Sequence, residues 1–139
     1  MRRYLVIANR TLCEQHLLDE LHRRRIADPG CRFHLVVPAT HPPGMFTDEQ
    51  CHAIARAQLA EALDTLAVAG ISATGEVGDA NPVTAVGDVL LRELGRFDEI
   101  IISTLPVGLS KWISENTVRR LKRATGLQVT HVIAELAHT

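Results

Sequence analysis

In the last third of the chain, polar residues that could bind a ligand follow directly on an apolar run. The three isoleucines Ile100–Ile102 are typical of a strand buried on both faces of a parallel sheet. Ser103 and Thr104 end the run, and Pro106 and Gly108 then interrupt regular backbone structure. Because open α/β sheets bind ligands beyond the carboxyl ends of their central strands, this loop is the first candidate for a functional site.

A second polar group follows the apolar run Tyr4–Ala8 at the start of the chain. Asn9, Arg10 and Thr11 lie where this strand would lead into a helix, and the amino end of a helix attracts anions. Asn9 and Arg10 are therefore candidate ligand contacts. The alternative is that Asn9 and Thr11 only satisfy backbone amides of the turn and the helix cap, with Arg10 in solvent.

Gly78 and Asp79 are a third candidate, because they follow an alternating run at 71–77 that indicates an outer strand. A tight turn explains these two residues better than a ligand does. Asn81 is a suitable helix cap and Pro82 a suitable first helical residue, so residues 78 to 82 also suffice to connect a strand to a helix.

A fourth candidate is Val37, which ends the apolar run 33–37. The proline-rich segment 38–44 that follows can continue neither a helix nor a central strand. We therefore expect a loop there, at the same edge of the sheet as the other candidates.

Residue patterns that signal catalysis or metal binding are missing. No histidine is close to Ser103 or Thr104 in the sequence, so we do not expect a nucleophile there. The seven histidines show no zinc-ligand spacing, and the three cysteines form no C-x-x-C pair. A P-loop and a G-x-G-x-x-G fingerprint are also absent. The sequence thus predicts no catalytic residue and no metal ligand.

Composition and charge are ordinary for a globular protein. The 139 residues carry a formal net charge of −1, so we expect no general attraction to nucleic acid or membranes. No segment approaches the ~20 apolar residues that span a bilayer, and the apolar start is too short for a secretory signal. An odd number of cysteines without a paired motif favours a reducing, cytoplasmic location.

Hydrophobic periodicity predicts five strands that alternate with four helices. The strands are expected at residues 4–8, 33–37, 71–77, 100–102 and 129–133. Capping boxes at Thr11–Glu14 and Thr47–Gln50 begin the first two helices, and glycines 70, 95 and 126 end the last three. The helical residues expected to face the sheet are Leu17, Leu18, Leu21, Ile26, Ile54, Ala55, Leu59, Ala62, Leu63, Leu66, Val86, Val89, Leu90, Leu94, Val118, Leu121 and Ala124.

This alternation predicts an α/β fold in one domain spanning residues 1–139. Right-handed crossovers make the five-stranded sheet parallel, and helices cover both of its faces in a three-layer, doubly wound sandwich. A reversal of winding direction places the first and fourth strands side by side in the middle. The expected strand order is therefore 3-2-1-4-5.

The order and spacing of four segments resemble the universal stress protein (UspA-like) family over nearly the whole chain. These segments are Ala8–Thr11, Val77–Pro82, Gly108–Ser110 and the final helix and strand at Val118–Val132. The resemblance implies the same five-stranded fold, a nucleotide site in some members, and homodimers that pair through the last strand. Val129–Ile133 has no proline or lysine to prevent such pairing.

The chain departs from the family at the loop that grips ATP, where nucleotide-binding members carry G-x-x-G, nine residues, and then G-[ST]. These positions fall on Ile102, Leu105, Glu115 and Asn116, so all three glycines are absent. Leu105 would fill space that phosphate oxygens need, and Glu115 would repel them. Asn9 also stands where ATP-binding members usually carry Asp.

The sequence therefore predicts a cytoplasmic, non-catalytic regulatory or ligand-sensing domain with a degraded ATP loop and no firmly expected cofactor. One alternative is a stress protein that binds a nucleotide or another small anion by a non-standard set of contacts. Another is an enzyme acting on a small anionic metabolite. The candidate ligand-binding residues are Asn9, Arg10, Val37, Gly78, Asp79, Ser103, Thr104 and Asn116.

Overall fold

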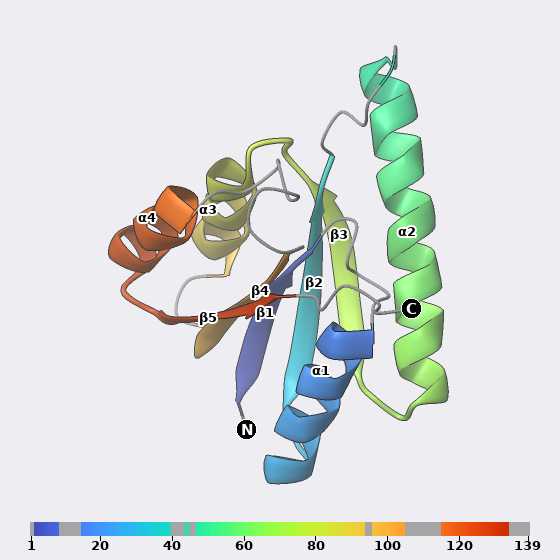
Figure 1. Cartoon of the computed structure of the whole chain (residues 1–139), viewed down its shortest axis with the longest axis vertical. Helices are drawn as coiled ribbons and strands as arrows, with labels where there is room; N and C mark the ends of the chain where they lie inside the picture. Colours follow the sequence, from blue (N-terminus) through green and yellow to red (C-terminus); the bar gives the residue numbers. More distant parts are fainter. Residues whose placement is uncertain are drawn as a thin grey trace, which may run out of the picture.

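The computed structural model describes residues 2–8, 15–39, 44, 47–93, 96–104 and 115–133. Within these residues, five strands alternate with four helices (Figure 1). In chain order they are β1 (Arg3–Ile7), α1 (Gln15–Ala27), β2 (Arg32–Pro38), α2 (Asp48–Val68), β3 (Ala73–Gly78), α3 (Pro82–Arg92), β4 (Glu99–Thr104), α4 (Glu115–Thr125) and β5 (Gln128–Ile133).

The strands form one parallel sheet in the order β3-β2-β1-β4-β5, which confirms the predicted fold class. The central strand β1 pairs with β2 on one side and with β4 on the other, so that Val6 lies opposite both Leu35 and Ile101. Figure 1 shows α1 and α2 on one face of the sheet and α3 and α4 on the other. The sheet is therefore the middle layer of three, as doubly wound connections require.

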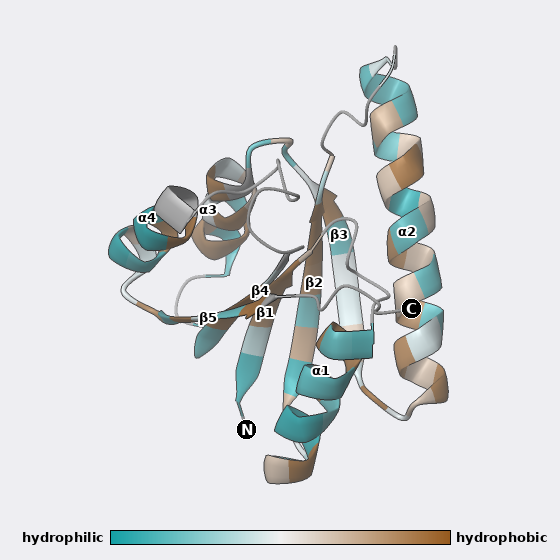
Figure 2. Cartoon of the chain, viewed as in Figure 1, coloured by the Kyte–Doolittle hydropathy of each residue, from teal (hydrophilic) through white to brown (hydrophobic). Residues whose placement is uncertain are grey.

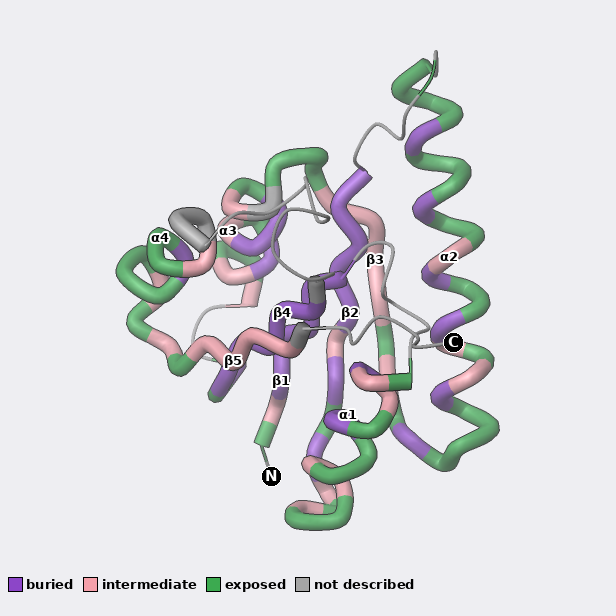
Figure 3. The backbone as a smooth tube through the Cα atoms, viewed as in Figure 1, coloured by how far each residue is buried: buried purple, intermediate pink, exposed green. Residues whose placement is uncertain are grey.

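Two hydrophobic cores lie on opposite faces of the sheet, because alternate residues of a strand point to opposite sides. Val6 and Ile101 belong to the core beneath α1 and α2. Leu5, Ile100 and Val86 belong to the core beneath α3 and α4. Apolar residues concentrate on the central strands in Figure 2, and the same strands are buried in Figure 3.

Local signals determine several helix ends. Thr47 and Gln50 form the predicted capping box, with Oγ1 of Thr47 accepting from the Gln50 amide at 3.1 Å and Oε1 of Gln50 accepting from the Thr47 amide at 2.8 Å. Asn81 caps α3 by accepting from two first-turn amides at 2.9 and 3.3 Å. Gly70 and Gly126 adopt positive φ angles of 78° and 68° after α2 and α4, as predicted for helix stops.

Some details of the prediction are wrong. Ile26 and Ile54 are 68% and 37% exposed, and Ala124 in the last turn of α4 is also exposed. Ile26 lies five residues after the buried Leu21, which turns it about 140° away from the apolar stripe. β3 begins at Ala73 rather than residue 71, because the residue 71 amide donates to a carbonyl at the end of α2. The first capping box, Leu94 and Gly95 lie outside the described residues.

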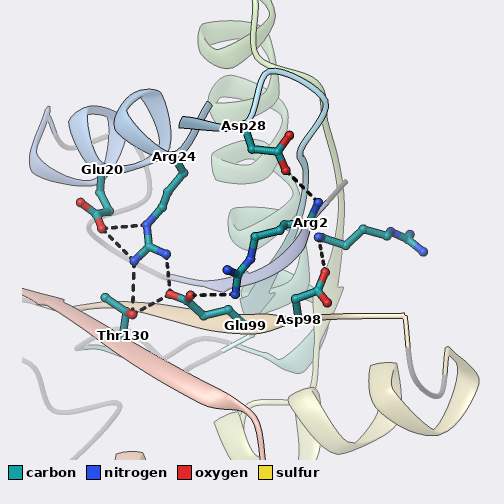
Figure 4. A network of polar contacts seen from close by, with 8 residues as sticks. Arg2, Glu20, Arg24, Asp28, Asp98, Glu99 and Thr130 are labelled. Carbon is teal, nitrogen blue, oxygen red and sulfur yellow. Dashed lines mark hydrogen bonds and ion pairs between the residues drawn. The ribbon is translucent and has the colours of Figure 1, made fainter. Parts of the chain in front are cut away.

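A charged group is buried at the start of β4, where it contacts a side chain from α1. The Glu99 carboxylate is only 2% exposed, and it accepts from the Arg24 guanidinium at 2.7 Å and the Thr130 hydroxyl at 2.6 Å. Arg24 also donates to Glu20 at 3.1 Å, and Arg2 lies 3.8 Å from the other Glu99 oxygen (Figure 4). Burial lowers the pKa of the Arg24 guanidinium, but its hydrogen bonds to Glu99 and Glu20 more than offset this and raise the pKa above its ordinary value.

Removing Arg24 should therefore destabilise the fold far more than removing a neighbouring surface arginine. We expect Arg24→Met to lower the free energy of unfolding by about 3 kcal/mol, because it leaves the Glu99 charge buried without its main partner. The Arg24→Met/Glu99→Leu double variant should recover most of this loss, since the Glu99 charge is removed together with its main partner. Chemical denaturation followed by circular dichroism measures both.

The matched control is Arg23→Met, which removes an arginine that is 73% exposed and paired with the same Glu20. Its cost should stay within about 1 kcal/mol. Equal losses for Arg23→Met and Arg24→Met would show that the buried pair contributes nothing special.

Candidate functional site

Only part of the predicted ligand site falls on the described residues. Asn9, Arg10 and Leu105 lie outside them. Thr104 is the last residue of β4 and Asn116 the second residue of α4, but their side chains are also outside the description. Val37, Gly78, Asp79 and Ser103 can be placed in full, and they lie at or near the carboxyl ends of their strands.

Ser103 is the described residue with the strongest case for a functional contact. It lies next to the carboxyl end of β4, and its side chain is fully buried. Its hydroxyl oxygen lies 3.0 Å from Nε2 of His16, in the first turn of α1. A buried hydroxyl and an imidazole thus meet at the edge of the sheet where doubly wound proteins bind their ligands.

The sequence prediction missed this pair because it looked for a base only near Ser103 in the chain. The two residues are 87 positions apart. A usable signal exists in the helical periodicity. His16 immediately precedes the core residue Leu17 and lies four and eight residues before Glu20 and Arg24, so it falls close to the side of α1 that faces the sheet.

The geometry of the pair allows two kinds of chemistry. A hydroxyl within hydrogen-bond distance of an imidazole nitrogen is the arrangement that activates a serine nucleophile. The same arrangement also satisfies a buried hydroxyl and can pass a hydrogen bond on to a ligand. Because Ser103 is 0% exposed and His16 is half-buried, the structure fits the second use better, with His16 as the member of the pair that a ligand could reach.

Gly78 and Asp79 serve the turn between β3 and α3, as the alternative interpretation held. A Cβ atom on Gly78 would lie 2.8 Å from Cβ of Ala85 and 2.9 Å from Cγ1 of Val36, so only glycine lets α3 pack this closely. Oδ1 of Asp79 accepts from the Asn81 amide at 2.8 Å. Both residues therefore have structural work that needs no ligand.

The structure does not bring all described candidates into one place. Val37 is fully buried in the core beneath α1 and α2, and it lies opposite Val77, beside the β3 end that carries Gly78. Ser103 lies on β4, with β1 between it and the β2 strand. The candidates therefore divide into two groups. One lies at the carboxyl ends of β2 and β3, and the other is the Ser103–His16 pair at the carboxyl end of β4.

Neither metal ligands nor a membrane helix are found in the part of the chain that the structure describes. There, no three His, Cys, Asp or Glu side chains cluster closely enough to hold a metal ion. No described helix combines the length and the apolar character needed to cross a bilayer. Cys31 and Cys51 are free thiols, 5% and 2% exposed. Burial raises the pKa of the Cys31 thiol, and the nearby Asp28 charge raises it further.

Comparison with known proteins gives a clear structural likeness. No protein-family model and no curated protein sequence matches this chain. Among solved structures, a universal stress protein from Archaeoglobus fulgidus superposes with a TM-score of 0.65 at 15% identity, covering 95% of this chain and 93% of that one. The chain has the universal stress protein fold.

Two more structures with the universal stress protein fold support this conclusion. One from Burkholderia pseudomallei has a TM-score of 0.63 at 16% identity, covering 95% of this chain and 96% of that one. One from Arabidopsis thaliana, solved with AMP bound, has a TM-score of 0.63 at 10% identity, covering 97% of this chain and 93% of that one. Each of the three superpositions covers 95% or more of this chain.

The packing at Gly78 leads to a test with a built-in control. Gly78→Ala should destabilise the protein by about 1–3 kcal/mol, because the new methyl group overlaps Ala85 and Val36. Gly87→Ala in α3 should instead stabilise it by about 0.5–1 kcal/mol, since a Cβ there meets nothing within 4 Å and alanine favours helix. Urea unfolding gives both values, and a neutral Gly78→Ala would show that close packing does not require glycine there.

Proposed function

We propose that this protein is a universal-stress-type regulatory domain that senses a small ligand without catalysis and has lost the standard ATP grip. The fold likeness over 95% of the chain supports the domain type. The half-buried His16, 3.0 Å from the Ser103 hydroxyl at the carboxyl end of β4, supports a ligand contact there, and the full burial of Ser103 speaks against a nucleophilic role. The cysteine pattern, an odd number without a C-x-x-C pair, supports a cytoplasmic location.

The main support for the loss of the glycine-rich ATP-binding loop is the environment of Ile102. This residue takes the place of the first loop glycine of nucleotide-binding members. Its side chain is 0% exposed and packs in the core beneath α3 and α4, and its backbone pairs with Ile7 and His131 on the two neighbouring strands. Backbone that is committed to the sheet in this way has no freedom to approach phosphate oxygens. Glu115, at a later glycine position, adds negative charge.

A second candidate function is nucleotide binding through a different set of contacts. The Arabidopsis structure has the same fold with AMP bound, and this supports the second candidate although the two sequences are only 10% identical. The contacts would come from Asn9, Arg10, Ser103 and Asn116, with Val37 and Gly78 supplying backbone groups at the β2–β3 edge. AMP lacks the β- and γ-phosphates, so it depends less than ATP on the missing glycines.

Thermal unfolding with ATP and AMP separates the two candidates. Under the first proposal, neither nucleotide raises the melting temperature of this protein. A ligand at 100 times its dissociation constant would add about 2.7 kcal/mol, or roughly 8 °C for a chain of this size. The Arabidopsis protein with AMP is the positive control.

A rise in melting temperature that disappears in Ser103→Ala but persists in Ser72→Ala would establish the second candidate instead. Ser72 is an exposed serine just before β3, so its replacement controls for loss of a hydroxyl elsewhere. If the rise in melting temperature disappears in both variants, the nucleotide does not bind specifically at the carboxyl ends of β1 and β4.

We also propose that the protein forms a homodimer through the edge strand β5, at Val129–Ile133. Among the described strands, β5 pairs with β4 alone, and residues 129 to 132 are partly buried rather than fully exposed. A parallel sheet that ends in an apolar strand can extend across a two-fold axis onto a second copy.

A charge in β5 should abolish this dimer. Val132→Lys is expected to sediment as a monomer where the unaltered protein sediments as a dimer, because a lysine would be desolvated in the joined sheet. Val68→Lys, at a site that is 90% exposed on α2, is the control and should leave the mass unchanged. Circular dichroism confirms that both variants are folded, and a folded Val132→Lys dimer would refute the β5 interface.

A further inference from the structure

A cavity of about 340 Å³ lies at the amino ends of the strands, whereas the candidate ligand site lies at their carboxyl ends. It is formed at the amino ends of β1 and β2 and the start of β3, on the face that carries α3 and α4. The side chains on this face that line it are Arg3, Arg32, His34, Ser72, Thr74 and Phe97. Its volume falls at the lower end of the range for small-molecule sites.

Among the described side chains that line the cavity, every ionisable one is basic. Arg3 and Arg32 lie directly opposite each other on β1 and β2, so their side chains leave the same face of the sheet about 5 Å apart. Like charges placed directly opposite on neighbouring strands destabilise a sheet. An anion between the two guanidinium groups would remove this repulsion.

The carboxylates near the cavity do not neutralise both arginines. Arg3 lies 4.0 Å from Glu93, at the outer limit of an ion pair, and stacks over the Phe97 ring with 5.4 Å to its centroid. Among the described residues, no carboxylate lies within ion-pair distance of the exposed Arg32 guanidinium. One guanidinium is thus held in place and the other is available to a ligand.

Two aromatic rings line the cavity, and hydrogen bonds hold one of them in place. Phe97 is 5% exposed, and its ring lies 6.2 Å from the His34 ring, centroid to centroid. His34 is held by Thr74 at 2.7 Å and by Glu76 at 3.1 Å. Burial raises the pKa of Glu76, but hydrogen bonds from His34 and Arg92 outweigh this and keep it below its ordinary value, so the anchor stays charged. Arg92 in turn ties this anchor to the end of α3.

We propose that this cavity binds a small organic anion: a carboxylate or phosphate held between Arg3 and Arg32, with an apolar body over Phe97 and His34. Two guanidinium groups supply the paired donors that such anions prefer. The rings supply a surface that an inorganic ion would not use. This site does not depend on the carboxyl-edge function, because it shares none of that site's residues.

A nuclear magnetic resonance titration of the full-length ¹⁵N-labelled chain with benzoate tests the proposal. Benzoate should shift the amide signals of residues 32–34, 72–74 and 97 saturably, with a dissociation constant of about 1 mM as suits so small a fragment. Benzamide has the same shape without the charge, and it should bind at least tenfold more weakly. Inorganic phosphate, which lacks the apolar body, should also bind at least tenfold more weakly.

Arginine variants locate the effect. Arg32→Gln and Arg3→Gln should each weaken benzoate binding at least tenfold, whereas Arg56→Gln, an exposed position on α2, should leave it unchanged. Arg32 is itself exposed, so its variant remains folded even if Arg3→Gln does not. Unsaturable shifts, shifts confined to the carboxyl edge near Ser103, equal binding of benzamide or phosphate, or undiminished binding to Arg32→Gln would each overturn the proposal.

Discussion

The rest of the structure depends on one buried charge, the Glu99 carboxylate. It sits at the start of the central strand β4, where an unpaired carboxylate would cost several kcal/mol. Arg24 of α1 supplies its nearest guanidinium at 2.7 Å, Arg2 lies 3.8 Å from its other oxygen, and Thr130 of β5 donates a hydroxyl. A single group therefore ties together a helix, a central strand and an edge strand that are far apart in the sequence.

The contact of α1 with the Glu99 carboxylate also determines where the amino end of this helix lies. Arg24 and His16 are eight residues apart, a little over two turns of helix. Glu99 and Ser103 are four residues apart on one face of β4. The ion pair between Arg24 and Glu99 at the amino end of β4 positions α1 so that His16 lies beside Ser103. The polar pair at the carboxyl end of β4 thus follows from this ion pair. This is the link between fold stability and the candidate site.

How far the sequence predicted this molecule depends on whether a feature is local. The apolar run at Ile100–Ile102 and the caps at Thr47 and Asn81 act within a few residues, and such local signals predicted the elements. The strand order was predicted from the alternation of strands and helices, with one reversal of winding direction. The Ser103–His16 pair joins positions 87 apart, and sequence spacing alone could not reveal it. The pairing of Arg3 with Arg32 likewise needs the register of two strands, which only the assembled sheet provides.

The two buried thiols have a consequence for how such a domain could respond to oxidants. Peroxide reacts with the thiolate form of cysteine. Burial raises the pKa of the Cys31 thiol and so disfavours that form, and it leaves both Cys31 and Cys51 with little access to solvent. While the chain is folded, these two sulfurs are chemically silent. Sulfenic acid at either position would therefore identify molecules that had already lost their native structure, and would be a record of damage rather than a signal.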